Sequence, residues 1–323
     1  MVALAELASL KRRALLALGL GGFTAAVGRR YWPQAPTSNY LASTAAGNDA
    51  LLNFMAAGDV GTGERAQHAV AQAMIQHQRV TPSPLVLLTG DNIYENGEIE
   101  KVGRVFEQPY AELLRQNTKF YAVLGNHDVR TNHGEDQVNY PGYNMAGRYY
   151  TFTQQAVQFF ALDTTQALDS DDKSPWRTQL AWFETALRRS QAPWKIVFAH
   201  HPVYSSGQHG SQQPLIDDLS PLVAEHGVQL YINGHDHNYE RTEPIDGTTY
   251  ITSGNGAKLR SVGRSDWTAA ASSQLGFTAF SVYADRIEVN AIDTNNAAYD
   301  AVSIAMTGAQ GAFAPGARSL SLA

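Results

Sequence analysis

The feature of this chain that most restricts its fold is an apolar run that stops at a glycine and is followed at once by polar side chains. The stretch is Tyr121-Ala-Val-Leu-Gly-Asn-His-Asp128. A run of this length and character is typical of a buried β-strand, and α/β sheets bind ligands just beyond the carboxyl ends of such strands. We therefore expect chemistry at this strand end.

The same arrangement occurs four more times, at apolar runs 51–57, 84–89, 194–199 and 228–232. The polar groups that follow the five runs are Asp59, Asp91, Asn126 with His127, His200, and His235 with His237. Each group alone has an ordinary explanation, because Gly-Asp after a strand commonly forms a turn or a cap. Together, in β-α-β order, they predict that parallel strands bring all five ends to one crevice. In the last group, two imidazoles at i and i+2 of an extended segment should point to the same side.

Composition narrows the chemistry. The 323 residues are 44% hydrophobic, enough for a sizeable core in one large domain or two smaller ones. A net charge of −6 argues against nucleic acid as a main partner. The absence of cysteine excludes disulfides, a thiol nucleophile and a thiolate metal site. Any metal must therefore be held by oxygen or imidazole ligands.

A crevice lined by this many carboxylates and imidazoles is costly unless cations occupy it. The candidate ligands are Asp59, Asp91, Tyr94, Asn126, His200, His235 and His237. They are too many for a single open catalytic ion and suit two ions bridged by one carboxylate.

Five motifs carry a resemblance to the calcineurin-like metallophosphoesterases. They are Gly58-Asp-Val-Gly61, Gly90-Asp-Asn-Ile-Tyr94, Gly125-Asn-His-Asp128, Val197-Phe-Ala-His200 and Gly234-His-Asp-His237. The tyrosine of the second motif is similar to that of the purple acid phosphatases, and the spacing most resembles their small, tartrate-resistant type. The resemblance runs from about Leu51 to about Tyr283.

The resemblance implies a ligand set and two substrate-contacting histidines. Fe(III) would be held by Asp59, Asp91, Tyr94 and His237, and a divalent ion (Fe, Zn or Mn) by Asp91, Asn126, His200 and His235, with Asp91 bridging. His127 would contact the substrate phosphate and protonate the leaving group, and His209 matches a second such histidine. His201 lines the entrance or packs, and Asp128 and Asn238 are candidates to orient ligand imidazoles.

The function expected from the residues and the resemblance is a binuclear acid phosphatase. It would hydrolyse small phosphate monoesters by attack of a metal-bound hydroxide. Two alternatives stay open: a manganese-dependent phosphodiesterase or nucleotidase of the same superfamily, and a peroxidase-like di-iron protein. A non-catalytic phosphate-binding protein would leave His127 without a task. The sequence leaves the physiological substrate, the divalent ion and the oligomeric state undetermined.

The expected fold is α/β, a four-layer α/β/β/α sandwich with two mixed sheets. Helical periodicity predicts helices at 64–79, 102–115 (interrupted near Pro109), 176–189 and 214–226. The β-α alternation predicts the first sheet, and the strand-rich C-terminal third is expected to supply the second. Residues 131–147 read as a long polar loop, and 148–153 with 157–162 as a hairpin.

The two ends of the chain read differently from its middle. Lys11-Arg12-Arg13 precedes an apolar run, 14–27, that is too short for a stable membrane span. This pattern predicts export, to the periplasm or beyond, by a twin-arginine-type signal; a leader on an intracellular protein is the alternative. We expect a leader and linker at 1–48, the catalytic domain at 49–307 and a flexible tail at 308–323.

Overall fold

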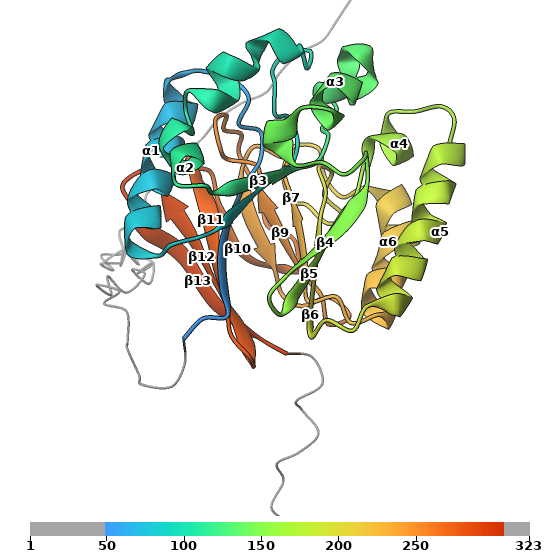
Figure 1. Ribbon diagram of the computed structural model, residues 1–323. Helices are drawn as coiled ribbons and strands as arrows, with labels where there is room; N and C mark the ends of the chain where they lie inside the picture. Colours follow the sequence, from blue (N-terminus) through green and yellow to red (C-terminus); the bar gives the residue numbers. More distant parts are fainter. Residues whose placement is uncertain (1–48, 307–323) are drawn as a thin grey trace, which may run out of the picture. The chain divides into compact units, whose positions relative to one another are not determined.

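The fold is built on two β-sheets whose apolar faces pack against each other, as seen in the computed structural model, which describes residues 49–306 (Figure 1). The predicted leader and tail, 1–48 and 308–323, lie outside the described residues. Between residues 49 and 306, none of the helices is long and apolar enough to cross a membrane.

The first sheet has the strand order β13-β12-β11-β1-β2-β3. Its strands are β1 Leu52–Ala57, β2 Leu85–Leu88, β3 Lys119–Ala122, β11 Gly276–Val282, β12 Arg286–Asp293 and β13 Ala298–Ala305. β1, β2 and β3 are parallel, whereas β11 runs antiparallel to β1 and begins a meander. β1 and β2 are almost wholly apolar because both faces of the sheet are covered. Phe54 faces the other sheet, and Met55 packs in the cluster that contains α1 (Arg65–Val80).

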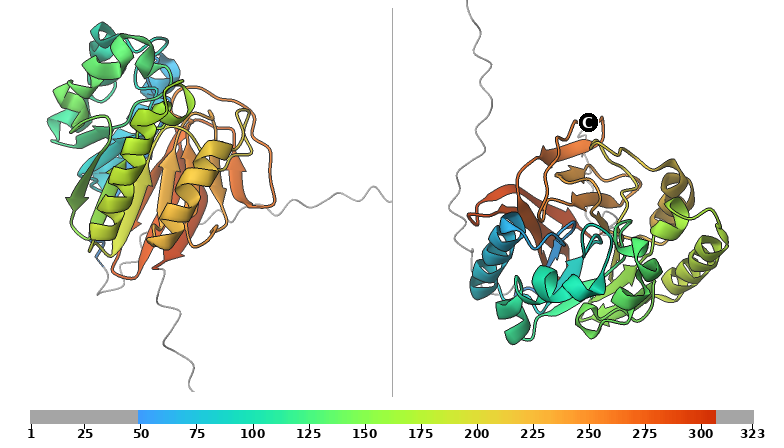
Figure 2. Two further views of the ribbon diagram at one scale, coloured as in Figure 1. Left: turned by 90° about the vertical axis from the view of Figure 1, so that its right-hand side faces the viewer. Right: turned by 90° about the horizontal axis from the view of Figure 1, so that it is seen from above.

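The second sheet has the order β10-β8-β9-β7-β6-β5-β4. Its strands are β4 Tyr150–Gln154, β5 Val157–Ala161, β6 Trp194–Phe198, β7 Leu230–Asn233, β8 Tyr239–Thr242, β9 Thr249–Ser253 and β10 Thr268–Ser272. β5, β6, β7 and β9 are parallel to one another. The outer face is covered by α5 (Ser174–Arg189) and α6 (Gln213–Glu225), while short α4 (Thr165–Leu168) also joins their apolar cluster (Figure 2).

The core between the sheets is aromatic. The ring of Phe54 stacks on Phe280 with centroids 4.4 Å apart and meets Phe159 of the second sheet edge-on at 5.3 Å. Such contacts add to the large apolar area that each ring buries. The predicted four-layer α/β/β/α arrangement is confirmed.

Two details of the prediction were wrong. The last three strands, β11–β13, extend the first sheet, and the second sheet comes mostly from residues 150–253. The order of strands in a sheet depends on which edge of the sheet is free. The apolar pattern of a strand does not indicate at which edge it will pair. β8 and β10 were not predicted.

The predicted helix 102–115 is also broken. It consists of a 3₁₀ turn at Ile99–Lys101, a π-helical turn at Gly103–Glu107 and the short α2, Ala111–Arg115. Pro109 lies at the break, where its missing N–H prevents a continuous helix. The polar loop 131–147 includes α3 (Glu135–Val138) and short 3₁₀ turns.

Candidate metal centre

The carboxyl ends of β1, β2, β3, β6 and β7 meet where the two sheets come together. Asn126, just after β3 of the first sheet, has its Oδ1 3.1 Å from Nε2 of His200 and 3.1 Å from Nδ1 of His235. These two histidines follow β6 and β7 of the second sheet. The predicted crevice therefore exists, but it is assembled from two parallel sets of strands in different sheets.

Three buried side chains form what we call the tyrosine cluster: Asp59, Tyr94 and His237. The hydroxyl of Tyr94 donates to Asp59 Oδ1 at 3.1 Å and lies 3.2 Å from Nε2 of His237. His237 Nε2 is 3.4 Å from the same carboxylate oxygen. A phenol, a carboxylate and an imidazole thus converge on one point.

Asn126, His200 and His235 form a second group, the asparagine cluster. Besides their contacts with Asn126, the facing nitrogens of the two imidazoles are 3.2 Å apart. Nδ1 of His200 lies 2.9 Å from the carbonyl oxygen of Thr89, which only accepts hydrogen bonds. The proton of neutral His200 is therefore on Nδ1, and Nε2 presents its lone pair to the cluster, as in protein metal sites.

Asp91 lies between the two clusters. Its Oδ1 is 3.5 Å from Nε2 of His200, and its charge and hydrogen bonding also act on Tyr94. A Cβ on Gly125 would lie 2.2 Å from this carboxylate oxygen, so only glycine fits there. Asp91 has a left-handed backbone, with φ of 53°, and Asp59 and His235 share this feature with φ of 58° and 70°. Such conformations in non-glycine residues concentrate at functional sites.

The left-handed backbone at His235 corrects one expectation. His235 and His237 were predicted to point to the same side of an extended segment, but the segment is not extended at His235. The two imidazoles enter different clusters, His235 beside Asn126 and His237 beside Tyr94.

The pKa shifts of the cluster residues show that the site lacks positive charge. Burial, together with the charges of Asp59 and Asp91, raises the pKa of Tyr94 well above its ordinary value. Burial lowers the pKa of His200, but the same two carboxylates outweigh it and raise that pKa overall. Burial would raise the pKa of Asp59, yet the hydrogen bond from His237 and the nearby imidazoles lower it. The negative charge of the two carboxylates thus favours positively charged groups at the site.

No lysine or arginine side chain in residues 49–306 pairs with either carboxylate. Ligand atoms of Asp59, Asp91 and His200 all lie within 4.8 Å of one another. Buried carboxylates without a cationic side chain need another cation. Carboxylate, phenol, amide and imidazole groups are suitable donors for a pair of metal ions, so the residues fit such a pair.

The two candidate substrate histidines lie next to these clusters. His127 packs edge-on against Tyr94 with ring centroids 4.7 Å apart, and its Nδ1 lies 2.7 Å from the carbonyl oxygen of Glu95. His209 lies over His235, with ring centroids 4.1 Å apart. Burial lowers the pKa of His209, and the charge of Arg260 acts in the same direction.

The supporting residues differ in part from those predicted. Asp128 accepts hydrogen bonds from the backbone N–H groups of Gly125, Asn92 and Ile93, at 2.8, 3.1 and 3.0 Å, and so fixes two loops without touching an imidazole. The side chain of Asn238 has no hydrogen-bond partner in the part of the chain that the structure describes. The expectation that these two residues orient imidazoles was therefore wrong.

One supporting residue was missed. Asp236 accepts from the backbone N–H of His209 at 2.9 Å and from Ser205, and so places the His209 loop. Its position between two candidate ligands was the available signal. His201 is buried against His235 and hydrogen-bonded to Thr164, so it packs rather than lining an entrance.

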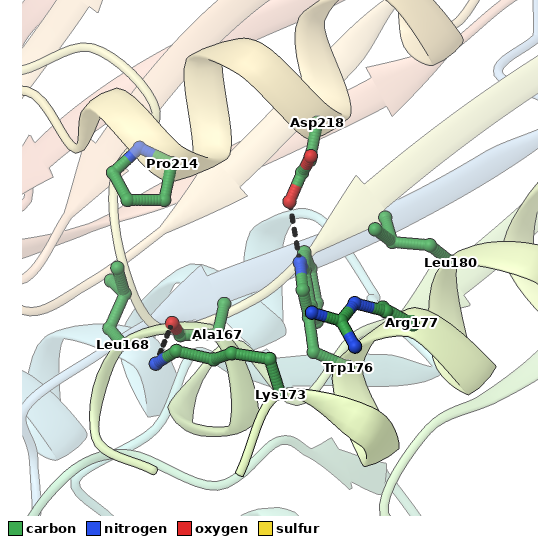
Figure 3. A pocket seen from close by; sticks show the side chains of 8 residues that line it. All are labelled: Ala167, Leu168, Lys173, Trp176, Arg177, Leu180, Pro214 and Asp218. Atoms are coloured by element: carbon green, nitrogen blue, oxygen red, sulfur yellow. Dashed lines mark hydrogen bonds between the residues drawn. The ribbon is translucent and has the colours of Figure 1, made fainter. Parts of the chain in front are cut away.

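A hollow of about 370 Å³ lies elsewhere, between α4, α5 and α6 (Figure 3). Trp176 lines it and donates to Asp218 at 2.7 Å, while Lys173 is bonded to the carbonyl oxygen of Ala167. None of its lining residues is a candidate metal ligand or substrate histidine.

Comparison with known proteins agrees with this geometry. The family model of the calcineurin-like phosphoesterases matches residues 52–239. The chain is 32% identical over 237 residues to purple acid phosphatase 17 of Arabidopsis thaliana, covering 65% of this chain and 70% of that protein. It is 29% identical over 237 residues to tartrate-resistant acid phosphatase type 5 of Mus musculus, covering 64% of this chain and 72% of that protein.

A solved structure is also similar. GAP50, the anchor in the inner membrane complex of Plasmodium, superposes with a TM-score of 0.70 and 22% sequence identity, covering 80% of this chain and 90% of that chain. At this identity the likeness concerns the fold alone. Two packed mixed sheets with clustered donor side chains at their strand ends define the class of metal-dependent phosphoesterases.

The chain belongs to the calcineurin-like phosphoesterase family and, within it, to the purple acid phosphatases. It is accordingly a hydrolase of phosphate esters.

Proposed function

We propose that this chain is a binuclear acid phosphatase that hydrolyses small phosphate monoesters. The observation that carries the proposal is the buried tyrosine cluster, in which the Tyr94 hydroxyl lies 3.1 Å from a carboxylate that has no lysine or arginine partner within residues 49–306. Fe(III) would be held by Asp59, Asp91, Tyr94 and His237, and divalent iron, zinc or manganese by Asp91, Asn126, His200 and His235.

The two donor sets favour unlike ions. The tyrosine cluster supplies carboxylate and phenol oxygens, which are hard donors suited to a trivalent cation. The asparagine cluster supplies two imidazoles and a neutral amide, which suit a divalent ion. Burial and neighbouring imidazoles lower the pKa of His235, which keeps it neutral and able to donate a lone pair.

When bound, the two cations neutralise the substrate phosphate and lower the pKa of a water molecule. The side chains of the protein then have two tasks, positioning and proton delivery. Nδ1 of His127 is engaged by the carbonyl oxygen of Glu95, so the proton available to the leaving-group oxygen is the one on Nε2.

Metal removal tests the proposal. Chelation of the purified protein should abolish hydrolysis of p-nitrophenyl phosphate, and iron together with zinc, manganese or ferrous iron should restore it. The matched substrate is bis-p-nitrophenyl phosphate, a diester with the same leaving group. An iron-free, colourless protein that cleaves the diester faster and needs only manganese would replace the proposal with a manganese-dependent phosphodiesterase.

We further propose that residues 49–307 form one catalytic domain and that the basic and apolar leader directs export. The pattern Lys11-Arg12-Arg13 before an apolar run supports export. Replacing Arg12 and Arg13 by lysine should retain the protein inside the cell; unchanged export would contradict the twin-arginine proposal.

A further inference from the structure

Two arginines beside the metal centre have no carboxylate partner in the described part of the chain. Arg130 has its Nη2 3.5 Å from Nε2 of His127, and its Nη1 donates to the carbonyl oxygen of Glu95 at 3.2 Å. Arg260 directs Nη1 at Nε2 of His209. Each candidate substrate histidine therefore has a guanidinium group next to it.

Arg260 is held in place by its own backbone. Its N–H donates to the carbonyl oxygen of His237, a candidate metal ligand, at 2.8 Å. The guanidinium group of Arg260 has five N–H donors. Among the described residues, the hydrogen bond that this group makes is the one to His209. It is half-buried, while Arg130 is exposed, so donors of both remain accessible to a ligand.

The charge around this rim is opposite to that of the whole chain. A third cation, Lys258, is 2.8 Å from the carboxylate of Glu95 and lies over the ring of Tyr94 at 3.5 Å. Glu95 pairs with Lys258 and its charge also acts on Arg130, so a single carboxylate faces Lys258, Arg130 and Arg260 on this rim, although the chain carries a net charge of −6. Local positive charge in an acidic protein concentrates anions at that place.

We propose that Arg130 and Arg260 bind a second oxyanion on the substrate, a carboxylate or a phosphate carried by the leaving group. The inference rests on the proposed function, because it places the hydrolysed phosphate against the two clusters and the two histidines. A leaving group then extends past those histidines to the arginines. Guanidinium groups match carboxylate and phosphate oxygens with paired hydrogen bonds, which makes these residues specificity-determining.

Two pairs of substrates separate the sources of the oxyanion. Phenyl phosphate and carboxyphenyl phosphate differ by a carboxylate on the leaving group. Adenosine monophosphate and adenosine diphosphate differ by a phosphate. For each pair we define the preference ratio as kcat/KM for the substrate with the extra anion divided by kcat/KM for its partner.

Substitution of the arginines should lower the preference ratio. We expect Arg260→Gln to reduce it about tenfold in at least one pair, the size of one charge-assisted hydrogen bond, and Arg130→Gln to reduce it in the same pair. Arg260→Lys should retain part of the preference, because it keeps the charge but loses the paired geometry. The matched control is Arg264→Gln, since Arg264 is exposed in the same loop and donates to the carbonyl oxygen of Ala269 at 2.9 Å.

The outcomes are distinguishable. A fall in one pair identifies that anion as the source. Unchanged ratios in both pairs, with phenyl phosphate still hydrolysed, overturn this inference and leave the proposed function standing. Metal-loaded wild-type protein that hydrolyses none of the four substrates overturns both.

Two further measurements guard against misfolding. Far-UV circular dichroism and metal content should match those of the wild type in each variant. If Arg260→Gln does not fold, the exposed Arg130→Gln decides.

In the wild type, added salt should lower the preference ratio, because salt screens exposed charges. A ratio that is indifferent to salt contradicts the inference.

Discussion

The tyrosine cluster and the asparagine cluster are built from the same kind of strand end, yet they differ in charge and in burial. Asp59, Tyr94 and His237 expose 0%, 4% and 6% of their surface. In the asparagine cluster His200 is also fully buried, but Asn126 and His235 are half-buried, and none of the three side chains is a carboxylate. Burial strengthens electrostatic interactions, so a cation between the charged oxygens of the tyrosine cluster should be held more firmly.

The comparison therefore suggests a division of labour. The tyrosine cluster is closed and carries a carboxylate, so it should retain its ion. The asparagine cluster is more open and has no carboxylate of its own, so its ion should exchange more readily. Asp91 contacts both, so it should couple their occupancy.

The largest effect is expected at the residue that both clusters share. Asp91→Asn should lose both ions and reduce phosphatase activity about a thousandfold, because the charge stabilisation worth several kcal/mol disappears. Activity on p-nitrophenyl phosphate and metal content per chain measure this. The matched control is Asp246→Asn, an exposed aspartate with a similar left-handed backbone, φ of 48°. Normal metal content in Asp91→Asn would show that the clusters are independent.

A smaller effect is expected at His127, which packs against Tyr94 but is not a candidate metal ligand. His127→Gln should lower kcat about a hundredfold for alkyl phosphates and much less for p-nitrophenyl phosphate, whose leaving group needs no proton. Metal content should not change. His68→Gln, an exposed histidine on α1, serves as the control. Equal losses with both leaving groups would contradict proton delivery by His127.

The smallest effect is expected at a residue outside both clusters. It concerns the free energy of unfolding at acidic pH and not catalysis. Burial lowers the pKa of His77 on α1 from 6.5 to about 4, and its Nε2 has no hydrogen-bond partner within residues 49–306. The folded state then binds fewer protons than the unfolded state between these pH values, so stability falls as pH falls through that window. His77→Leu should remove this loss, about 2 kcal/mol, in urea unfolding at acidic pH.

The control for this prediction is the same variant near neutrality. There His77→Leu should change the free energy of unfolding little, because the wild-type imidazole is already neutral. A difference in unfolding free energy between the wild type and His77→Leu that does not depend on pH between 6.5 and 4 would show that His77 titrates normally.

The site was predictable from the sequence to the extent that it depends on strand ends. Asp59 and Asp91 follow apolar runs, and the rule that ligands bind at carboxyl ends of parallel strands brings them together. What a strand pattern does not contain is a local backbone turn. His235, with φ of 70°, sends its imidazole to a different cluster from His237, and no periodicity reveals that.

Contacts between loops were beyond prediction for another reason. Arg260 and His209 are 51 residues apart in irregular segments, and their approach depends on Asp236 holding one loop and on the backbone of His237 holding the other. Strand order failed similarly, since β11 pairs with β1 across more than 200 residues. Local patterns describe elements, whereas these features depend on how distant segments pack.

The central claim, two unlike metal sites with a tyrosine in one of them, is tested most directly by the visible absorption spectrum of the purified protein, recorded together with its metal content. We predict two ions per chain, one of them iron, and a charge-transfer band from the phenolate of Tyr94. Tyr94→Phe should lose that band but retain the ion at the site formed by Asn126, His200 and His235. A band of unchanged intensity in Tyr94→Phe, or a colourless wild-type protein with both sites filled, would contradict the account.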